Sequence, residues 1–575
     1  MKLVIAKTAG FCMGVRRAVE MVLSAPGRCE GPIYTYGPLI HNPQVLEMLR
    51  EKGIFVLGQI PAQGTGTVLI RAHGVPPETR RQLEEAGFTV IDATCPRVIK
   101  VQSIIRKHAG QGYATLIVGD RDHPEVVGLL GYAGASGRVV SRMADLEALP
   151  AFERAIIVAQ TTQNKNFFDA VRQWAAAHHP HYKVFDTICD STARRQEEVR
   201  RLAEEADALV VVGGRSSGNT RRLAEIAAAS GKPTVHVETE AELDADLLAG
   251  ARSVAVTAGA STPNWIIKRV CRRLETLPVE SGGTWSHFCY HLQQTLLRTN
   301  TYVAVGAGSL CYACIQLQRF HRILPLVLLA ALYVQSMHVL NNLTGQQEDR
   351  YNDPGRAHFY QRHRFALALL ALVSGGLGLL MALWAGTKPF AVLAVMSLLG
   401  LSYSLNLVPA RLGWRIRRIR DLPGSKTVLI ALAWATVAVL LPALAQNGRI
   451  DAATLLVFAI CALLVFARTA FFDILDVQGD RIVGKETLPV VLGEAVTLRL
   501  LKASLILAAA GLALGALSGL TSPLAVWLLA CPLFLYLVFS AYTRGRIHPG
   551  VRLEFLIETN FVMAGILAFF WTLVT

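Results

Sequence analysis

The sequence predicts a multidomain protein. An N-terminal α/β domain, with three pseudo-repeated strand-cysteine-helix lobes around a common centre, precedes an all-α transmembrane bundle of about nine helices. The first observation behind this prediction is a change of composition. Up to about Leu277 charged and apolar residues mix as in a soluble α/β protein, whereas from about Leu296 apolar runs of roughly 20 residues dominate, each long enough to cross a bilayer. We therefore expect domains at residues 1–278 and 296–575, joined by a linker at 279–295.

The second observation is a threefold repeat in the first half of the chain. An apolar run leads to a cysteine at the start of an amphipathic segment, and this happens at Cys12, Cys95 and Cys189. The three cysteines lie far apart in the sequence, so no local zinc-binding spacing explains them. Only a fold that brings three strand ends together makes them one site, and ligands of open α/β sheets bind at the carboxyl ends of strands.

Charge and cysteine content narrow the range of partners. The 575-residue chain has a net charge of +15 and ten cysteines without the spacing of disulfide pairs. The thiols favour a reducing, cytosolic environment. The basic residues concentrate in the loops of the second half, which favours an anionic membrane leaflet or a phosphorylated substrate and argues against nucleic acid.

Three histidines, His41, His73 and His123, stand at equivalent places, each after an apolar run and shortly before a proline. Because proline suits the first helical turn, we expect each histidine at a helix N-terminus, where free N–H groups favour an anion. Two glycine-rich turns also follow apolar runs and bear small hydroxyl and amide side chains, which suit phosphate oxygens. Their candidate ligands are Ser217, Gly218, Asn219 and Ser261.

Three converging thiolates fit two kinds of metal centre. A cubane 4Fe-4S cluster takes four thiolates, so three leave one iron open to a substrate. A zinc ion held by three thiolates and a histidine is the alternative, although it gives no reason for a phosphate pocket. Taken singly, a cysteine is most often a small buried hydrophobe and a histidine a cap or surface residue, but their repetition at strand ends favours a site.

Seven motifs resemble the 4-hydroxy-3-methylbut-2-enyl diphosphate reductase family, from residue 1 to about 275. They are Gly10-Phe11-Cys12-Met13-Gly14-Val15, Ala72-His73-Gly74-Val75, Asp92-Ala93-Thr94-Cys95-Pro96, His123-Pro124-Glu125-Val126, Gln160-Thr161-Thr162, Arg195-Gln196 and Thr257-Ala258-Gly259-Ala260-Ser261. The resemblance implies the last step of the non-mevalonate isoprenoid route, a two-electron reductive removal of an allylic hydroxyl that gives isopentenyl and dimethylallyl diphosphate. The chain departs from the family at Ser191-Thr192, where Ala-Thr is usual, and at Ser217-Gly218-Asn219, where many members have Ser-Ser-Asn.

The same resemblance implies a role for each candidate residue. Cys12, Cys95 and Cys189 are implied to hold a 4Fe-4S cluster. Glu125 is implied to be the proton donor, working with Thr161. The implied ligands of the substrate diphosphate are His41, His73, His123, Thr161, Ser217, Gly218, Asn219 and Ser261. Electrons are implied to come from a carrier such as ferredoxin or flavodoxin.

The second half contains nine plausible membrane spans. They lie at about 299–316, 323–340, 364–386, 389–408, 427–445, 452–472, 499–518, 522–541 and 554–574. Alternate loops, at 341–363, 409–426, 473–498 and 542–553, hold most of the arginines and lysines. The positive-inside rule therefore places these loops and the N-terminal domain in the cytoplasm, on a multi-pass protein of the cell inner membrane.

Acidic residues gather on the same side. Asp473, Asp476 and Asp480 are spaced three and four residues apart, which puts three carboxylates on one face of a helix end. Oxygen ligands in this arrangement suit Mg²⁺, which typically bridges carboxylates to a diphosphate. A solvated acidic helix end is the alternative, although three such close carboxylates repel one another without a cation.

With Arg481, Lys485-Glu486-Thr487-Leu488-Pro489 and Gly493, these aspartates resemble the second aspartate motif of UbiA-type intramembrane prenyltransferases, over about 296–575. Leu422-Pro423-Gly424-Ser425-Lys426 and Tyr403-Ser404 resemble that family too. The family's first motif is Asn-x-x-x-Asp-x-x-x-Asp. Counting from Asn341 gives Gly345 and Asp349, and a shifted register gives Asp349 and Asp353 with Gly345 at the asparagine position. The implied magnesium ligands are thus Asp473, Asp476, Asp480, Asn341, Asp349 and Asp353, with one ligand missing in either register.

The two resemblances together predict a fusion of an iron-sulfur reductase with a Mg²⁺-dependent membrane prenyltransferase that joins a polyprenyl diphosphate to a lipophilic acceptor. A reductase with a catalytically inactive anchor or lipid-binding module is the alternative. A transporter is disfavoured because the acidic cluster lies at the membrane surface and not at mid-membrane. Cys311 and Cys314, inside an apolar span, are interpreted as packing residues, with a metal or redox role as the lesser alternative.

Overall fold

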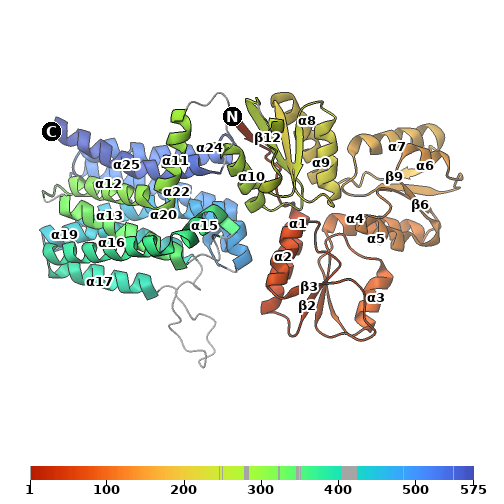
Figure 1. The fold of residues 1–575 in the computed structure, drawn as a ribbon, viewed down its shortest axis with the longest axis horizontal. Helices are drawn as coiled ribbons and strands as arrows, with labels where there is room; N and C mark the ends of the chain where they lie inside the picture. Colours follow the sequence, from red (N-terminus) through yellow and green to blue (C-terminus); the bar gives the residue numbers. More distant parts are fainter. Residues whose placement is uncertain are drawn as a thin grey trace. The chain divides into compact units, whose positions relative to one another are not determined.

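The computed structural model describes residues 2–244, 246–248, 250–276, 284–321, 324–344, 349, 351–402, 424–483, 485–547 and 549–575. The chain forms two compact units, Met1–Gly282 and Gly283–Thr575 (Figure 1). Helix α11 (Thr284–Arg298) occupies most of the segment that the sequence assigned to a linker. Gly345, Leu422-Pro423 and Tyr403-Ser404, which entered the motif assignments, lie outside the described residues.

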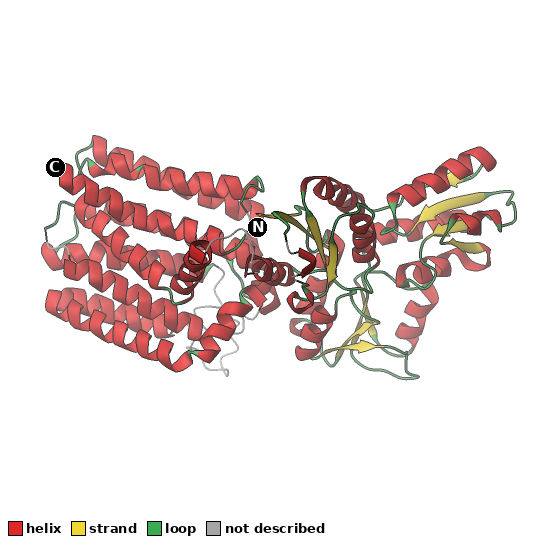
Figure 2. Ribbon diagram, turned by 45° about the horizontal axis from the view of Figure 1, so that its top comes forward, coloured by secondary structure: helices red, strands yellow, loops and turns green. Residues whose placement is uncertain are grey.

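The first unit contains three four-stranded sheets in which all neighbouring strands are parallel (Figure 2). The first sheet has the order β1 (Lys2–Ile5), β12 (Ser253–Ala258), β10 (Ala208–Val212), β11 (Thr234–Val237). The second has the order β3 (Ile54–Leu57), β2 (Ile33–Tyr36), β4 (Thr67–Ile70), β5 (Thr89–Asp92). The third has the order β7 (Gly137–Val140), β6 (Ala114–Val118), β8 (Ala155–Ala159), β9 (Lys183–Val184). The central strands β6, β8 and β10 are buried along their whole length, as expected for parallel strands covered on both faces.

Among the described residues of this unit, nine α-helices lie between strands and a tenth, α10, follows the last strand. They are α1 (Met13–Ser24), α2 (Pro43–Glu51), α3 (Pro77–Glu85), α4 (Pro96–Ala109), α5 (Pro124–Ala133), α6 (Met143–Glu147), α7 (Lys165–His178), α8 (Asp190–Glu205), α9 (Gly218–Ala228) and α10 (Asn264–Thr276). Helices α2, α3, α4 and α5 all begin at a proline, whose missing N–H costs nothing in the first helical turn. The predicted α/β class of the first half is confirmed.

The second unit is helical. Beyond α11 its helices are α12 (Thr301–Leu317), α13 (Leu324–Thr344), α15 (Pro354–Arg362), α16 (Arg364–Ala385), α17 (Thr387–Ser402), α18 (Ser425–Ala435), α19 (Leu441–Gln446), α20 (Ala452–Val483), α21 (Leu488–Leu492), α22 (Glu494–Leu517), α23 (Leu524–Leu528), α24 (Ala530–Thr543) and α25 (Val551–Val574). A π-helical turn, Thr436–Leu440, joins α18 to α19.

Within the described part of this unit, seven helical segments are long and apolar enough to cross a membrane. Two of the nine predicted spans correspond to the shorter apolar helices α12 and α17. Helix α20 continues beyond the predicted span 452–472 and ends at Val483. The three aspartates, Asp473, Asp476 and Asp480, therefore lie on one unbroken helix. The protein is therefore a membrane protein with a helical second half.

Candidate functional sites

The three repeated cysteines occupy the same structural position. Cys12, Cys95 and Cys189 are the N-cap residues of α1, α4 and α8. Their backbone amides donate hydrogen bonds to the carbonyls of Ala260, Ala72 and Thr161, at 3.1, 2.9 and 3.0 Å. Each of these carbonyls follows a strand that pairs with the strand before the cysteine, so the repeat seen in the sequence is a repeat of three-dimensional structure.

The environment of these thiols fits a shared cationic centre. All three are partly exposed and free of disulfides. Burial raises the pKa of the Cys95 thiol, the amides of Arg97 and Val98 lower it, and the neighbouring Cys12 and Cys189 raise it again. Thiolates that repel one another at helix N-termini become stable together when a metal centre balances their charge. The donor set therefore fits an iron-sulfur cluster held by three cysteines.

Two neighbours position the thiols. A Cβ atom built on Gly14 would collide with the sulfur of Cys95, so α1 approaches α4 closely only because residue 14 lacks a side chain. Arg195, only 3% exposed, donates hydrogen bonds to the carbonyls of Thr8 and Gly10 in the loop that leads to Cys12. Sequence analysis assigned Arg195 to a family motif but to no role. The feature that could have indicated its role is that a charged residue lies on the buried face of α8.

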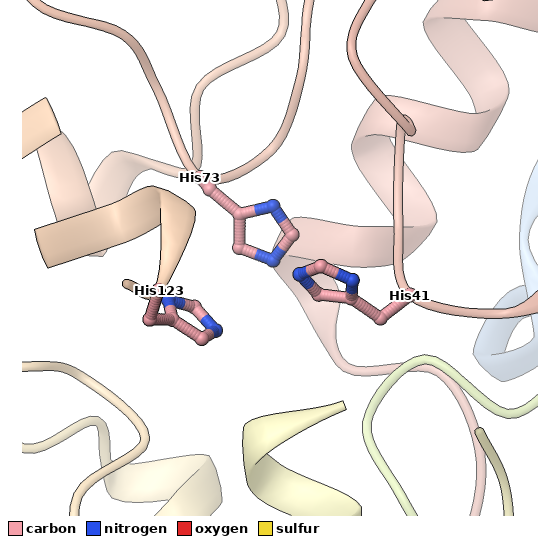
Figure 3. A group of neighbouring side chains, drawn as sticks. All are labelled: His41, His73 and His123. Carbon is pink, nitrogen blue, oxygen red and sulfur yellow. The ribbon is translucent and has the colours of Figure 1, made fainter. Parts of the chain in front are cut away.

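The three predicted histidines converge. The side chains of His41, His73 and His123 point toward one another, with ring centroids 4.7 to 5.5 Å apart (Figure 3). His123 is the N-cap of α5 and His41 directly precedes the N-cap Asn42 of α2, as expected. His73 differs, because α3 begins only at Pro77, so the predicted helix N-terminus does not hold for this residue.

All three imidazoles are neutral near pH 7. Burial lowers the pKa of His123 to about 4, and the pKa of His73 also lies well below its usual value because of burial and the two neighbouring histidines. Burial and the nearby Arg71 lower the pKa of His41. One nitrogen from each ring lies within 4.8 Å of the other two, so by distance alone the three histidines could hold a metal ion.

The tautomer of His123 favours an anion over a metal. Nδ1 of His123 accepts a hydrogen bond from the backbone amide of Glu125 at 3.1 Å, so the proton of the neutral ring is on Nε2. A ring that carries its proton on Nε2 donates from that nitrogen and cannot ligate a metal with it. In addition, Nε2 of His41 and Nδ1 of His73 are buried without a hydrogen-bond partner among the described residues. These atoms suit the oxygens of a bound anion.

The glycine-rich turns lie next to these histidines. Ser217 is the N-cap of α9, and Ser261 Oγ lies 3.3 Å from Ser217 Oγ and 3.2 Å from the carbonyl of His41. Both side-chain polar atoms of the buried Asn219 lack a partner among the described residues. A Cβ atom on Gly218 would lie 3.5 Å from Nε2 of His123, so the turn and the histidines border the same space.

Glu125 is a buried carboxyl two residues after His123, whose ring borders this space. It is 1% exposed, and its two oxygens accept hydrogen bonds from the amide of Thr161 at 2.6 Å and from Thr161 Oγ1 at 2.9 Å. Burial raises the pKa of Glu125 to about 7, although both hydrogen bonds from Thr161 lower it. The carboxyl therefore holds a proton that it can release near neutral pH.

The second unit brings together the two acidic segments that lie far apart in its sequence. Asp473, 1% exposed, accepts a hydrogen bond from Thr427 Oγ1 at 2.5 Å and forms an ion pair with Lys426 at 3.4 Å. Asp480 accepts a hydrogen bond from Asn352 at 3.3 Å, while its second carboxylate oxygen is buried without a partner among the described residues. Burial raises the pKa of Asp480 to about 7, with contributions of opposite sign from Lys426 and Asp476.

The first acidic segment faces the second through Asp349. Burial raises the pKa of Asp349 to about 6; Arg356 lowers it, and Asp353 and Asp476 raise it. Asp353 is engaged differently, because it caps α15 by accepting from the amide of Arg356 at 2.9 Å. Sequence analysis did not identify Asn352, which contacts Asp480. The only feature of the sequence that could have indicated a role for Asn352 is its position next to Asp353. The neighbouring carboxylates repel one another and raise the pKa of Asp349 and Asp480, so a bound cation would stabilise their charged forms.

An apolar cavity of about 300 Å³ lies beside the acidic cluster, between α13, α17 and α18. Asn341 and Lys426 are in its wall, and Lys426 also contacts Asp473. The other lining residues include Tyr333, Met337, His338, Met396, Leu429 and Trp434. Cys311 and Cys314, by contrast, are buried in the helix bundle, where Cys311 Sγ contacts the carbonyl of Leu326 at 3.6 Å, as a packing role requires.

Comparison with known proteins agrees with this division. Residues 3–275 match the family model described as LytB protein, and residues 301–571 match that of the UbiA prenyltransferase family. The 4-hydroxy-3-methylbut-2-enyl diphosphate reductase of Aquifex aeolicus is 43% identical over 283 residues, which is 48% of this chain and 96% of that protein. The protein of the same name from Geobacter sulfurreducens is 44% identical over 286 residues, 49% of this chain and 100% of that protein.

Two solved structures are also similar. The E-1-hydroxy-2-methyl-but-2-enyl-4-diphosphate reductase from Plasmodium falciparum is 26% identical, with a TM-score of 0.46 over 50% of this chain and 90% of that chain. A UbiA homolog from Aeropyrum pernix K1 is 17% identical, with a TM-score of 0.37 over 46% of this chain and 97% of that chain. The chain belongs to the 4-hydroxy-3-methylbut-2-enyl diphosphate reductase family through residues 3–275 and carries a UbiA prenyltransferase family domain in residues 301–571.

Proposed function

We propose that the first unit reduces 4-hydroxy-3-methylbut-2-enyl diphosphate to isopentenyl and dimethylallyl diphosphate. The observation that carries this proposal is the arrangement of a proton-bearing Glu125 beside an anion pocket and three converging cysteines. The net reaction takes up two electrons and two protons, breaks the bond between carbon and the allylic hydroxyl, and releases water. Relatives that bear the name of this reductase support the assignment.

Each group of residues has a separate role in the proposed reduction. Cys12, Cys95 and Cys189 would hold a 4Fe-4S cluster, which when bound supplies electrons and an open coordination position. The neutral histidines donate hydrogen bonds to the diphosphate, and burial in the pocket strengthens each bond. The residues proposed to bind the diphosphate are His41, His73, His123, Thr161, Ser217, Gly218, Asn219 and Ser261. Glu125 delivers the proton to the leaving hydroxyl, and Thr161 holds the carboxyl in place.

An anaerobic preparation of the full chain tests this proposal. It should contain about four irons per chain and turn over the substrate with a reduced viologen, and a ferredoxin or flavodoxin should replace the viologen. Serine at Cys12, Cys95 or Cys189 should remove both iron and turnover, whereas serine at the buried Cys271, outside the repeat, should remove neither. A variant of a repeat cysteine with full iron content and normal turnover would remove that residue from the site.

We propose further that the second unit transfers a prenyl group from a polyprenyl diphosphate to a lipophilic acceptor. Ionisation of an allylic diphosphate requires that the charge of the departing diphosphate be neutralised. Asp473, Asp476 and Asp480, with Asp349 nearby, would hold a Mg²⁺ ion, which would supply the positive charge for this. Asn341 and Asp353 would complete the site from the first motif. The apolar cavity beside Lys426 offers room for part of a prenyl chain.

An inactive lipid-binding anchor is the second candidate, favoured by the glycine at position 345 where the family motif has an aspartate or an asparagine. The two candidates differ in their response to Asp476→Ala. For a transferase, this change abolishes Mg²⁺-dependent transfer, and Gly345→Asp leaves transfer unchanged or raises it. For an anchor, polyprenyl diphosphate binds without transfer to any of a panel of aromatic and lipid acceptors, and Asp476→Ala leaves that binding intact.

The basic loops support an orientation for the whole chain. The loops at 341–363, 409–426, 473–498 and 542–553 hold most of the positive charge and also the aspartates. We infer that they and the first unit lie on the cytoplasmic side of the cell inner membrane. The C5 diphosphates are then released on the side where the proposed diphosphate site of the second unit opens.

A further inference from the structure

A buried ion pair links helices α20 and α25 of the second unit near the apolar cavity. Arg468 on α20 and Glu558 on α25 are 5% and 2% exposed, and Nε of Arg468 lies 2.9 and 3.1 Å from the two carboxylate oxygens. The proposed transfer reaction gives this pair no role. A charged pair inside a membrane span is costly and is therefore generally associated with function or with fixing a specific arrangement.

This ion pair fixes the indole of Trp434. The guanidinium carbon of Arg468 lies 5.2 Å from the centre of the Trp434 ring and 5.1 Å from that of Phe472. Stacking of a guanidinium on aromatic faces is favourable, most of all with tryptophan. Because Trp434 is also 2% exposed, its ring has a defined orientation, and so does its N–H group.

The indole in turn sets the tautomer of a histidine in the cavity wall. Trp434 Nε1 donates a hydrogen bond to His338 Nε2 at 3.4 Å. A nitrogen that accepts carries no proton, so the ring of His338 is neutral with its proton on Nδ1. In the part of the chain that the structure describes, Nδ1 of His338 has no hydrogen-bond partner, and His338 lines the cavity. Besides Asn341 and Lys426, the mainly apolar wall of the cavity thus includes the ring of His338, whose tautomer is set by Trp434.

The N–H donor of His338 lies near the proposed diphosphate site. His338 precedes Asn341 by three residues on α13, so it lies on the same helix face roughly 4.5 Å farther from the acidic cluster. A group bound at His338 is therefore next to the reactive end of a prenyl chain whose diphosphate is held at Lys426 and the aspartates.

We propose that His338, oriented by Trp434, donates a hydrogen bond from Nδ1 to an oxygen of the lipophilic acceptor and so selects acceptors that carry a carbonyl, phenol or other oxygen function over plain hydrocarbons. The identification of this ligand as the acceptor rests on the proposed prenyl transfer. The hydrogen-bond donor itself does not, because it needs neither the metal nor a diphosphate.

A matched pair of probes tests the donor directly. Benzophenone has a carbonyl acceptor and no donor, and diphenylmethane has the same two rings without oxygen. We would measure equilibrium binding of each to the full chain in lipid nanodiscs, corrected for partition into empty nanodiscs, and map benzophenone photolabelling by mass spectrometry. The native chain should prefer benzophenone by about threefold to tenfold, as expected for one net hydrogen bond, with labelling on α13 or α18.

Three variants test whether the preference for benzophenone depends on His338 and Trp434. His338→Leu fills a similar volume without a donor and should bind both probes equally. His338→Asn keeps an N–H close to the position of Nδ1 and should retain a preference. Trp434→Phe removes the group that fixes the tautomer and should reduce the preference. A preference that persists unchanged in His338→Leu, or equal or absent binding of the two probes by the native chain, would overturn the proposal.

The outcome is separable from that of the proposed transferase. Asp476→Ala should abolish prenyl transfer and leave the preference for benzophenone intact. A chain that transfers nothing but keeps the preference contradicts the transferase and supports the donor at His338. A chain that transfers a prenyl group without any preference contradicts the donor and leaves the transferase standing.

Discussion

Among single residues, the carboxyl of Glu125 has the most specific chemistry to test. Replacing it with glutamine keeps the size of the side chain and removes the transferable proton. Turnover of the reductase should fall by roughly 10²- to 10⁴-fold, the usual contribution of a general acid, while iron content and substrate binding stay the same. Unchanged turnover would transfer the role to another group, with Thr161 next in position.

The pH profile follows from the same residue. Because burial raises the pKa of Glu125 to about 7, the carboxyl keeps its proton below pH 7 and loses it above. Turnover limited by proton donation should therefore decline above about pH 7 in the native chain. That alkaline limb should be missing from the residual activity of Glu125→Gln, which provides the control within one experiment. A limb that persists in the variant belongs to a different group.

Proton uptake tests the state of the histidines. His41, His73 and His123 all have lowered pKa values and are neutral at pH 7, and the negative charge of a bound diphosphate raises those values. Binding of inorganic pyrophosphate at pH 7 should therefore take up protons. Calorimetry in buffers with different ionisation enthalpies measures this number. No change would mean that His41, His73 and His123 stay neutral and donate to the anion as neutral rings, whereas release of protons would contradict the neutral state derived for the free pocket.

At the scale of secondary structure, the contact between α1 and α4 makes the cluster site sensitive to one glycine. A methyl group at residue 14 would collide with Cys95 Sγ. Gly14→Ala should therefore lower the iron content of the purified chain. Gly58→Ala is a matched control, because a Cβ there meets no atom within 4 Å. Equal iron content in both variants would show that α1 tolerates a shift away from α4.

A second glycine tests the link between the two acidic segments. A Cβ at Gly479 on α20 would collide with Oδ1 of Asn352, the residue that donates to Asp480. Gly479→Ala should reduce Mg²⁺-dependent prenyl transfer, while Gly376→Ala on α16, where a Cβ meets no atom within 4 Å, should not. If both variants transfer normally, the contact of Asn352 with Asp480 does not matter for the reaction.

These elements also show what the sequence could predict. The strand-cysteine-helix pattern located the N-caps Cys12, Cys95 and Cys189, because local propensity determines where a strand ends and a helix begins. The corresponding expectation for the histidines failed at His73, because Gly74, Val75 and Pro76 separate this residue from α3. The span 452–472 ended too early, because hydropathy marks the membrane limit and not the end of helix α20.

Contacts between distant helices could not be predicted. Asn352 with Asp480, and Arg468 with Glu558 and Trp434, join residues far apart in the sequence, and each partner alone looks like an ordinary polar residue. Hydrophobic periodicity reports which face of a helix is buried but not which helix covers it. The carboxylate positions of the second motif were predictable because their spacing lies within one helix.

Each of the two compact units has its own core and its own site. One consequence is independence: a change at the metal ligands of one unit should leave the other active. The covalent link then means only that the reductase domain, whose proposed products are C5 diphosphates, stays attached to a membrane domain that matches the UbiA prenyltransferase family.

A crossed activity measurement tests the claim that one chain carries two separable enzymes. The full chain and its Cys12→Ser and Asp476→Ala variants are assayed anaerobically for reduction of the C5 hydroxy substrate and for Mg²⁺-dependent prenyl transfer. We predict that Cys12→Ser loses only the reduction and Asp476→Ala only the transfer. A native chain that reduces but transfers to no acceptor, or a variant that loses both activities while remaining folded, would contradict the claim.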